Sequence, residues 1–187
     1  MSNVIDNRQY VNEIFQECQN KSIAIEKTII YIKKIKKLKR KIFFIGNGAS
    51  NTIGSHFALD FSKNLMIPSF SLNNSAIITA IANDLDPKLI FSKYLQLISS
   101  KKDLLIAISS SGESINIIKA VNFFKKIGSV ITLTGMSATN SLIKSNKNGV
   151  NIHVNLKGYN QIESAHNVIL GLITDKIKGR KIYSVNI

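Results

Sequence analysis

The sequence of 187 residues has no tryptophan, two prolines and a single cysteine, Cys18. A single cysteine excludes an internal disulfide, and its place in a helical apolar pattern indicates a small buried side chain rather than a nucleophile. No apolar run approaches the roughly 18 residues of a membrane span. The first residues lack the basic and then apolar layout of a signal peptide. We therefore expect a cytoplasmic protein that has no membrane partner.

Acidic side chains are few, 11 against 25 lysines and arginines, which gives a formal net charge of +14. Such a charge ordinarily raises nucleic acid as a partner. Here lysine, isoleucine and asparagine are abundant together, as an A/T-biased coding sequence produces. The one lysine cluster, 33–41, carries Ile35 and Leu38 at helical spacing and is typical of the solvated end of a helix. With no array of stacking aromatic residues, nucleic acid is not the expected partner.

The length and the 44% hydrophobic content predict one domain with one core over residues 1–187. Apolar positions between 8 and 38 recur at helical spacing and predict one long or once-broken amphipathic helix. A helix ahead of a sheet has no crossover to make. We therefore expect the N-terminal helical segment, 1–40, to pack across the domain or against a neighbouring subunit, which would make it an oligomerising element.

Five apolar runs predict β-strands, and helical patterns separate them. The runs are 41–45, 69–72, 104–108, 129–135 and 150–154. Strands that alternate with helices predict the α/β class, here a doubly wound parallel sheet with helices on both faces. Five strands favour the order 2-1-3-4-5, in which strands one and three are neighbours at the switch point. The loops 46–51 and 109–114 are then expected to meet at the carboxyl edge of the sheet.

The loop after the third strand is rich in hydroxyls and reads Ser109-Ser110-Ser111-Gly112-Glu113-Ser114. Hydroxyls and backbone N–H groups at the start of a helix, with Ser114 placed to cap it, suit a phosphate group. A serine-rich surface loop would explain this stretch alone equally well. The predicted meeting with loop 46–51 favours the phosphate interpretation.

The loop 46–51 begins like a dinucleotide fingerprint, with Gly46 and Gly48, but Asn51 replaces the third glycine. Asn73 and Asn74 stand where a ribose-binding acid is needed after the second strand. No nucleotide cofactor is therefore expected.

Two histidines admit plain structural explanations. His56 and Asp60 lie four residues apart on one helix margin, where they could face a pocket or bond to each other beside the core. His153 alternates with apolar residues and is most simply a satisfied or solvent-facing strand residue.

Four segments together resemble the SIS (sugar isomerase) domain family, and within it the phosphoheptose isomerase branch, over nearly the whole chain: 44–50, 55–64, 80–84 and 108–114. The resemblance implies the SIS fold and a homotetramer with sites near subunit interfaces. It also implies that five serines contact a sugar phosphate: Ser50, Ser109, Ser110, Ser111 and Ser114. Asn47 and Asp84 would lie near the sugar hydroxyls, and Gly48 and Asn51 complete the expected substrate-binding set.

In phosphoheptose isomerases a His and a Glu on the second helix and a Gln and a His on the last helix form a metal and acid/base site, commonly occupied by zinc. In this sequence His56 matches, Asp60 stands for the Glu, Glu163 for the Gln, and Gly171 occupies the place of the second His. The resemblance therefore implies zinc on His56, Asp60 and Glu163, a set that His166 could join.

Aldose–ketose isomerisation needs a base that moves a proton between adjacent carbons and an acid or metal that stabilises the oxyanion. Asp60, Glu163 and His166 are the candidate catalytic residues, with Asp60 as base and His166 as acid. The expected function is the conversion of sedoheptulose 7-phosphate to D-glycero-D-manno-heptose 7-phosphate for lipopolysaccharide or surface-polysaccharide sugars. The alternative, which Gly171 favours, is a non-catalytic SIS module that binds a sugar phosphate or a protein partner as a regulator.

Overall fold

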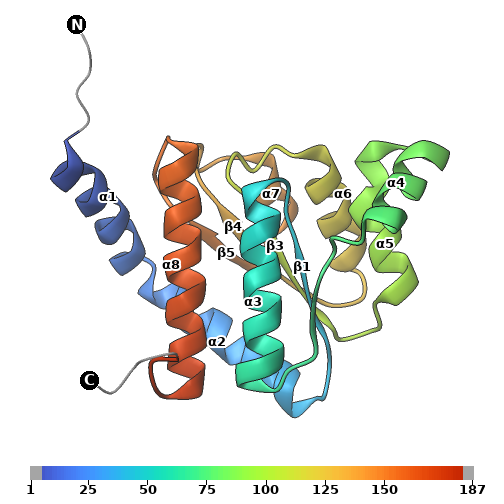
Figure 1. The fold of residues 1–187 in the computed structure, drawn as a ribbon, viewed down its shortest axis with the longest axis horizontal. Helices are drawn as coiled ribbons and strands as arrows, with labels where there is room; N and C mark the ends of the chain where they lie inside the picture. Colours follow the sequence, from blue (N-terminus) through green and yellow to red (C-terminus); the bar gives the residue numbers. More distant parts are fainter. Residues whose placement is uncertain (1–5, 183–187) are drawn as a thin grey trace, which may run out of the picture.

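A computed structural model describes residues 6–182 and shows a five-stranded sheet in which every strand pairs with its neighbours in parallel. The strand order is β2-β1-β3-β4-β5 (Figure 1), so the expected α/β fold class and strand order are confirmed. Strands β1 and β3 pair from Ile42 with Leu104 to Ile45 with Ala107, which fixes the switch point. The strands are β1 (Ile42–Ile45), β2 (Ser69–Ser71), β3 (Leu104–Ser109), β4 (Ser129–Thr134) and β5 (Val150–His153).

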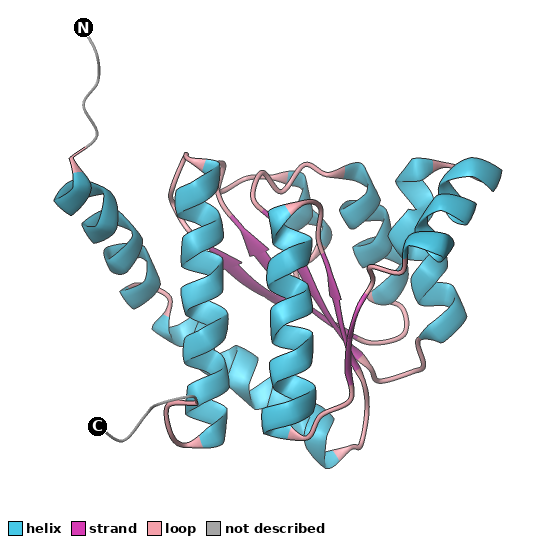
Figure 2. Cartoon of the chain, viewed as in Figure 1, coloured by secondary structure: helices cyan, strands magenta, loops and turns pink. Residues whose placement is uncertain are grey.

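Helices cover both faces of the sheet (Figure 2). One face carries α1 (Asn7–Gln19), α2 (Ser22–Lys37), α3 (Ala49–Leu65) and α8 (Tyr159–Lys178). The other face carries α4 (Ser75–Asp84), the 3-10 turn η1 (Pro87–Leu89), α5 (Ile90–Ile98), α6 (Ile115–Phe124) and α7 (Ser141–Ser145). Figure 1 shows α3 and α8 side by side across the first face.

Alternation along the strands divides the core into two clusters. Phe44 and Ile106 pack with α3 and α8, whereas Phe43 and Leu105 pack with α5 and α6 on the opposite face. Because both faces are covered, every residue of β1 and β3 is buried. This double burial explains the unbroken apolar runs of the sequence.

The N-terminal segment is a helix broken once, between α1 and α2, as the sequence predicts. Helix α2 buries Ile25, Ile29 and Ile32 against the sheet. Helix α1 lies along α8 and buries only Cys18, while Val11 and Phe15 are 61% and 58% exposed. Within residues 6–182, no helix has the length and hydropathy to cross a membrane.

Candidate functional site

The loops that follow β1 and β3 meet at the carboxyl edge of the sheet, as expected from the strand order. The contact is a reciprocal pair of amide hydrogen bonds: Asn47 Nδ2 donates to Asn116 Oδ1 at 3.1 Å, and Asn116 Nδ2 donates to Asn47 Oδ1 at 2.9 Å. Asn116 also accepts the backbone N–H of Ile117 through Oδ1, at 3.0 Å. The start of α6 is thereby tied to the loop that precedes α3.

A small pocket of about 110 Å³ lies between these loops and the start of α8. Its lining is mainly hydroxyls and amides, with one carboxylate: Asn47, Ser50, Ile108, Ser109, Ser110, Ser111, Ser114, Tyr159 and Glu163. Ser109 Oγ donates to Ser114 Oγ at 3.3 Å, and Ser111 Oγ accepts the N–H of Glu113 at 3.2 Å. The hydroxyl of Ser110, a residue only 5% exposed, has no hydrogen-bond partner among the described residues. A ligand oxygen that accepts a hydrogen bond from this hydroxyl would satisfy it, which explains why it is unpaired at the pocket wall.

Backbone contacts hold the serine loop in place. Gly112 has a φ of +68°, and a Cβ there would lie 2.2 Å from Cγ of Asn140, so only glycine fits. Leu142 donates its N–H to the carbonyl oxygen of Gly112 at 2.9 Å. Glu113 accepts the N–H of Ser141 at 3.0 Å, and hydrogen bonds from Ser141 lower the pKa of the Glu113 carboxyl. The loop is therefore preorganised against α7.

Two helices begin at this pocket, α3 after Gly48 and α6 after Ser114. Gly48 has φ +52° and ψ −127°, a combination that requires glycine. Ser114 occupies the N-cap position of α6, as expected, but its hydroxyl pairs with Ser109 and makes no capping bond to the helix within the described chain. The N–H groups and positive dipole end of a helix favour an anion. Together with the hydroxyls, they make the pocket suitable for a phosphate group.

The other predicted substrate-binding residues do not line this pocket. Asn51 accepts a hydrogen bond from Ser71 at 3.1 Å and so supports β2. Asp84 ends α4 and accepts a bond from Asn83 at 2.9 Å. The substrate-binding roles of Asn51 and Asp84 therefore stay predictions.

Of the three candidate catalytic residues, only Glu163 lines the pocket. Asp60 is 6% exposed, accepts from Asn64 Nδ2 at 3.1 Å, and lies 3.5 Å from His56 Nε2 through its other oxygen. Of the two possibilities for the His56 and Asp60 pair, the structure has the bond between them beside the core. Asp60 therefore stays a sequence-based candidate.

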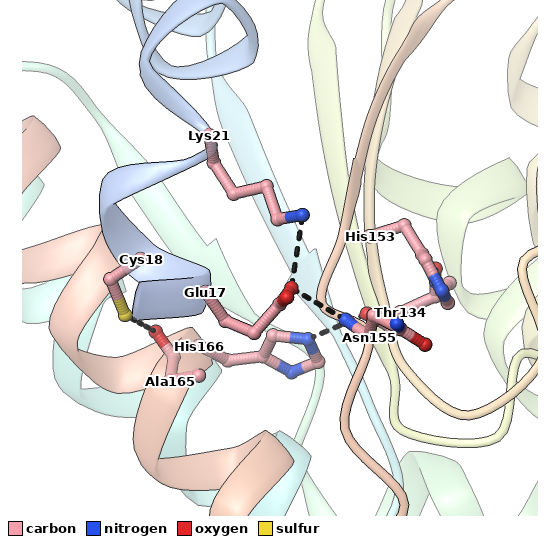
Figure 3. A network of polar contacts seen from close by, with 8 residues as sticks. All are labelled: Glu17, Cys18, Lys21, Thr134, His153, Asn155, Ala165 and His166. Atoms are coloured by element: carbon pink, nitrogen blue, oxygen red, sulfur yellow. Dashed lines mark hydrogen bonds and ion pairs between the residues drawn. The ribbon is translucent and has the colours of Figure 1, made fainter. Parts of the chain in front are cut away.

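His166, the residue expected to supply the acid, is not among the residues that line the pocket, and its role as acid stays a prediction. Its ring is fully buried in the contact between α8 and the sheet, where Nε2 donates to the carbonyl oxygen of Thr134 at 3.2 Å (Figure 3). Burial lowers the pKa of His166 to about 4, so the imidazole is neutral at physiological pH. The residue faces the core because it belongs to the buried stripe of α8.

A network near His166 holds α1 to the end of the sheet (Figure 3). Glu17 accepts the N–H of Asn155 at 2.6 Å and pairs with Lys21 at 3.0 Å, and Cys18 donates to the Ala165 carbonyl at 3.8 Å. His153 Nδ1 lies 3.1 Å from Thr134 Oγ1, and burial lowers the pKa of this ring. These contacts fit the structural roles expected for Cys18 and His153.

The expected zinc ligands do not come together. Over residues 6–182, no group of three or more His, Cys, Asp or Glu side chains is arranged to hold a metal ion. His56 and Asp60 pair on α3, while Glu163 projects from α8 into the serine pocket. The donor set His56, Asp60 and Glu163 therefore does not fit a metal in this chain.

Two residues at or beside the pocket were not predicted from the sequence. Tyr159, the first residue of α8, lines the pocket, and Asn116 positions Asn47. Tyr159 follows the last strand and so lies at the same carboxyl edge, a signal that the strand order alone provides. The Asn116 contact spans 69 residues and has no local signal.

A parallel, doubly wound sheet with its pocket at the switch point defines the class of α/β proteins that bind ligands at the carboxyl ends of their strands. The SIS domain model matches residues 7–135, so the chain belongs to the SIS domain family.

Curated relatives include phosphoheptose isomerases. That of Buchnera aphidicola subsp. Acyrthosiphon pisum (strain Tuc7) is 35% identical over 130 residues, which cover 66% of this chain and 67% of the relative. The phosphoheptose isomerase of Cytophaga hutchinsonii is 35% identical over 127 residues, which cover 65% of this chain and 66% of the relative.

Two solved phosphoheptose isomerases share the fold. The structure from Neisseria gonorrhoeae has a TM-score of 0.86 and 24% identity and covers 92% of this chain and 94% of its own. The structure from Francisella tularensis has a TM-score of 0.85 with the same identity and coverage.

Proposed function

We propose that this protein isomerises sedoheptulose 7-phosphate to D-glycero-D-manno-heptose 7-phosphate in the cytoplasm, for the sugars of lipopolysaccharide or surface polysaccharide. The proposal rests on one observation: the serine hydroxyls that suit a phosphate group and the carboxylate of Glu163 line the same pocket. The names of the curated relatives, phosphoheptose isomerases, support the reaction class. The free, buried Cys18 is compatible with a reducing compartment.

The phosphate group of the substrate binds in the serine loop. The hydroxyl of Ser110 donates to a phosphate oxygen and gains the partner that it otherwise lacks. The hydroxyls of Ser111 and Ser114 and the N–H groups at the start of α6 complete the cradle. Because the loop is held by Gly112 and Glu113, little ordering accompanies binding.

The sugar carbons extend from the phosphate toward α8, where Glu163 and Tyr159 line the wall. Glu163 removes a proton from the hydroxyl-bearing carbon beside the carbonyl and returns it to the carbon that carried the carbonyl. In the enediol a proton also passes from the hydroxyl oxygen of the first carbon to the oxygen of the second, so that the first becomes the aldehyde and the second a hydroxyl. The hydroxyl of Tyr159 and the amide of Asn47 are the donors in this pocket that stabilise the enediolate oxygen. These steps use only side chains that line the pocket.

Residues 1–187 form one SIS domain that assembles into a homotetramer, with α1 in the interface. Helices α1, α3 and α8 pack side by side and expose apolar side chains: Val11, Phe15, Leu59, Val168 and Leu172. Exposed apolar surface of this kind marks contacts between proteins. Light scattering should give four chains per particle, and Phe15→Lys should give a smaller species. A monomeric wild-type protein at micromolar concentration would contradict the assembly.

The reaction is tested by turnover of sedoheptulose 7-phosphate and shorter ketose phosphates, with and without added zinc. Glu163→Gln keeps the shape of the side chain and removes the base, so kcat should fall by about 10²-fold or more while KM changes little. Asp60→Asn tests the other candidate base in the same assay, and with Glu163 as the base it should retain most of kcat. A larger loss of kcat in Asp60→Asn than in Glu163→Gln would assign the base to Asp60 instead.

If the protein binds a sugar phosphate but turns over none of these sugars, the enzyme assignment is contradicted. Such a result would favour the non-catalytic SIS module that the glycine at position 171 suggests.

A further inference from the structure

A second cavity, of about 420 Å³, lies at the edge of the sheet opposite the serine loop. It is bounded by the start of β4 (128–130), by the end of α7 with the segment that leads to β5 (144–149) and by Tyr31 of α2. The strands are parallel, so the starts of β4 and β5 and the end of β3 lie at opposite edges. This cavity is therefore separate from the serine pocket, and both can be filled at once.

Lysines dominate the chemistry of this cavity. Lys125 directly follows α6, Lys144 lies in α7 and Lys147 in the segment between α7 and β5, and none of the lining residues is acidic. Lys125 Nζ donates to Asn122 Oδ1 at 2.8 Å and to the Ser145 carbonyl at 3.3 Å, which holds the ammonium group at the rim. Within residues 6–182, none of the three lysines forms an ion pair.

Two carboxylates on elements next to the cavity, Asp103 and Glu113, accept hydrogen bonds from N–H groups. Asp103 accepts the N–H of Lys41 at 3.0 Å and that of Ser100 at 2.8 Å. Glu113 accepts the N–H of Ser141. Neither carboxylate lines the cavity, but the charge of Lys144 contributes to the lowered pKa of the Glu113 carboxyl. Among the described residues, Lys125 and Lys147 form no ion pair, so the cavity keeps their positive charge.

The floor of the cavity is preformed. The side chain of Asn146 is buried, and its Nδ2 donates to the carbonyl oxygens of Val130 at 3.3 Å and Val150 at 3.2 Å. A Cβ at Gly149 would lie 2.3 Å from Asn146 Oδ1, and one at Gly128 would lie 2.2 Å from the Asp103 carbonyl. These tight contacts fix the walls before a ligand arrives, which lowers the entropic cost of binding.

We propose that this cavity binds a small phosphorylated molecule that carries at least two negative charges. Three ammonium groups around a preformed floor match a diphosphate or polyphosphate group, since lysine binds phosphate as a point charge. The volume exceeds that of one phosphate and falls within the roughly 300–1,000 Å³ typical of small-molecule sites. Tyr31 offers a ring to the organic part of the ligand. A walled cavity, rather than an open basic stripe, favours a small molecule over a nucleic acid.

Titration calorimetry with pyrophosphate and with ATP tests the site, in a Ser111→Ala/Ser114→Ala background that weakens binding at the serine loop. Lys144→Ala/Lys147→Ala should raise the Kd at least about tenfold, because two charged contacts are lost. Lys88→Ala/Lys119→Ala removes the same charge from exposed positions that do not line the cavity and should leave the Kd unchanged.

Three outcomes would overturn the proposal. The first is no binding by the background protein, and the second is an equal loss in both lysine pairs, which would indicate only general charge attraction. The third is a single-stranded oligonucleotide that binds through Lys144 and Lys147 more tightly than pyrophosphate or ATP.

Discussion

Asn47 and Asn116 exchange two side-chain hydrogen bonds, of 3.1 and 2.9 Å, and so join the loop after β1 to the start of α6. Asn47 lines the serine pocket, whereas Asn116 does not. In the proposed reaction Asn116 is a positioning residue, because its two hydrogen bonds hold the Asn47 amide at the wall of the pocket. This pair makes the two halves of the site one unit.

Asn116→Ala should free the Asn47 amide to turn away from the sugar. We expect KM for the sugar phosphate to rise about three- to tenfold and the free energy of unfolding to fall by about 1 kcal/mol, the value of a typical hydrogen bond. Steady-state kinetics and urea unfolding measure the two effects. Asn122→Ala, on the same helix but away from the pocket, is the control and should leave KM unchanged. Equal KM values for both variants would remove the positioning role.

Ser110→Ala should separate stability from ligand binding. The buried Ser110 hydroxyl lacks a partner among the described residues, so its removal should leave the free energy of unfolding unchanged or raise it by up to about 1 kcal/mol. Binding of the sugar phosphate should weaken about tenfold, because a charge-assisted hydrogen bond is lost.

The matched control for Ser110 is Ser92→Ala. Ser92 is also buried, but its hydroxyl donates to the Leu89 carbonyl at 3.0 Å. Its removal should lower the free energy of unfolding and leave ligand binding unchanged. Chemical unfolding and calorimetry on both variants make the comparison, and a loss of stability in Ser110→Ala as large as in Ser92→Ala would contradict the ligand interpretation.

Gly112→Ala should destabilise the protein in two ways, through a strained backbone and through a clash of the new Cβ with Asn140, and Gly179→Ala measures the first alone. Gly112 and Gly179 both have positive φ, +68° and +78°, but a Cβ at Gly179 meets nothing within 4 Å, whereas at Gly112 it meets Asn140. Gly179→Ala should therefore cost about 1 kcal/mol of unfolding free energy, from the backbone alone. Gly112→Ala should cost about 2 kcal/mol more and displace the serine loop. Urea unfolding measures both variants, and equal losses would show that the Asn140 contact yields without cost.

The sheet could be predicted because its signals are local. Each buried strand is an apolar run between polar turns, and helices between the strands force parallel pairing. The serine pocket followed from the strand order, since the loops after β1 and β3 must meet at one edge. The contact of Asn116 with Asn47 could not be predicted, because it depends on the rotamers of a loop residue and of a residue in the first turn of α6.

The position of His166 shows a different limit. Glu163 and His166 are three residues apart on α8, so they lie on neighbouring faces of the helix. The sequence analysis placed both at the site, yet Ile162, Ile169 and Ile173 form a stripe that includes His166 and faces the core. The apolar pattern around a polar residue is thus a better guide to its burial than its distance from a candidate catalytic residue.

The buried His166 should also make the protein less stable in mild acid. Its pKa is about 4 in the folded protein against an ordinary value of 6.5, because burial disfavours the charged ring. Between these values the unfolded chain binds a proton that the folded chain does not, so the free energy of unfolding falls as the pH decreases. The fall begins near pH 6.5, ends near pH 4 and amounts to at most about 3 kcal/mol.

Urea unfolding of the wild type and of His166→Gln across this range checks the effect. Burial also lowers the pKa of His153, and hydrogen bonds lower that of Glu17 nearby, but both groups are present in both proteins. The difference between the two stability curves therefore isolates His166 and should shrink steadily from pH 6.5 to pH 4. Parallel curves over that interval would mean that water reaches the ring and keeps its pKa near the ordinary value, in contradiction to a fully buried His166.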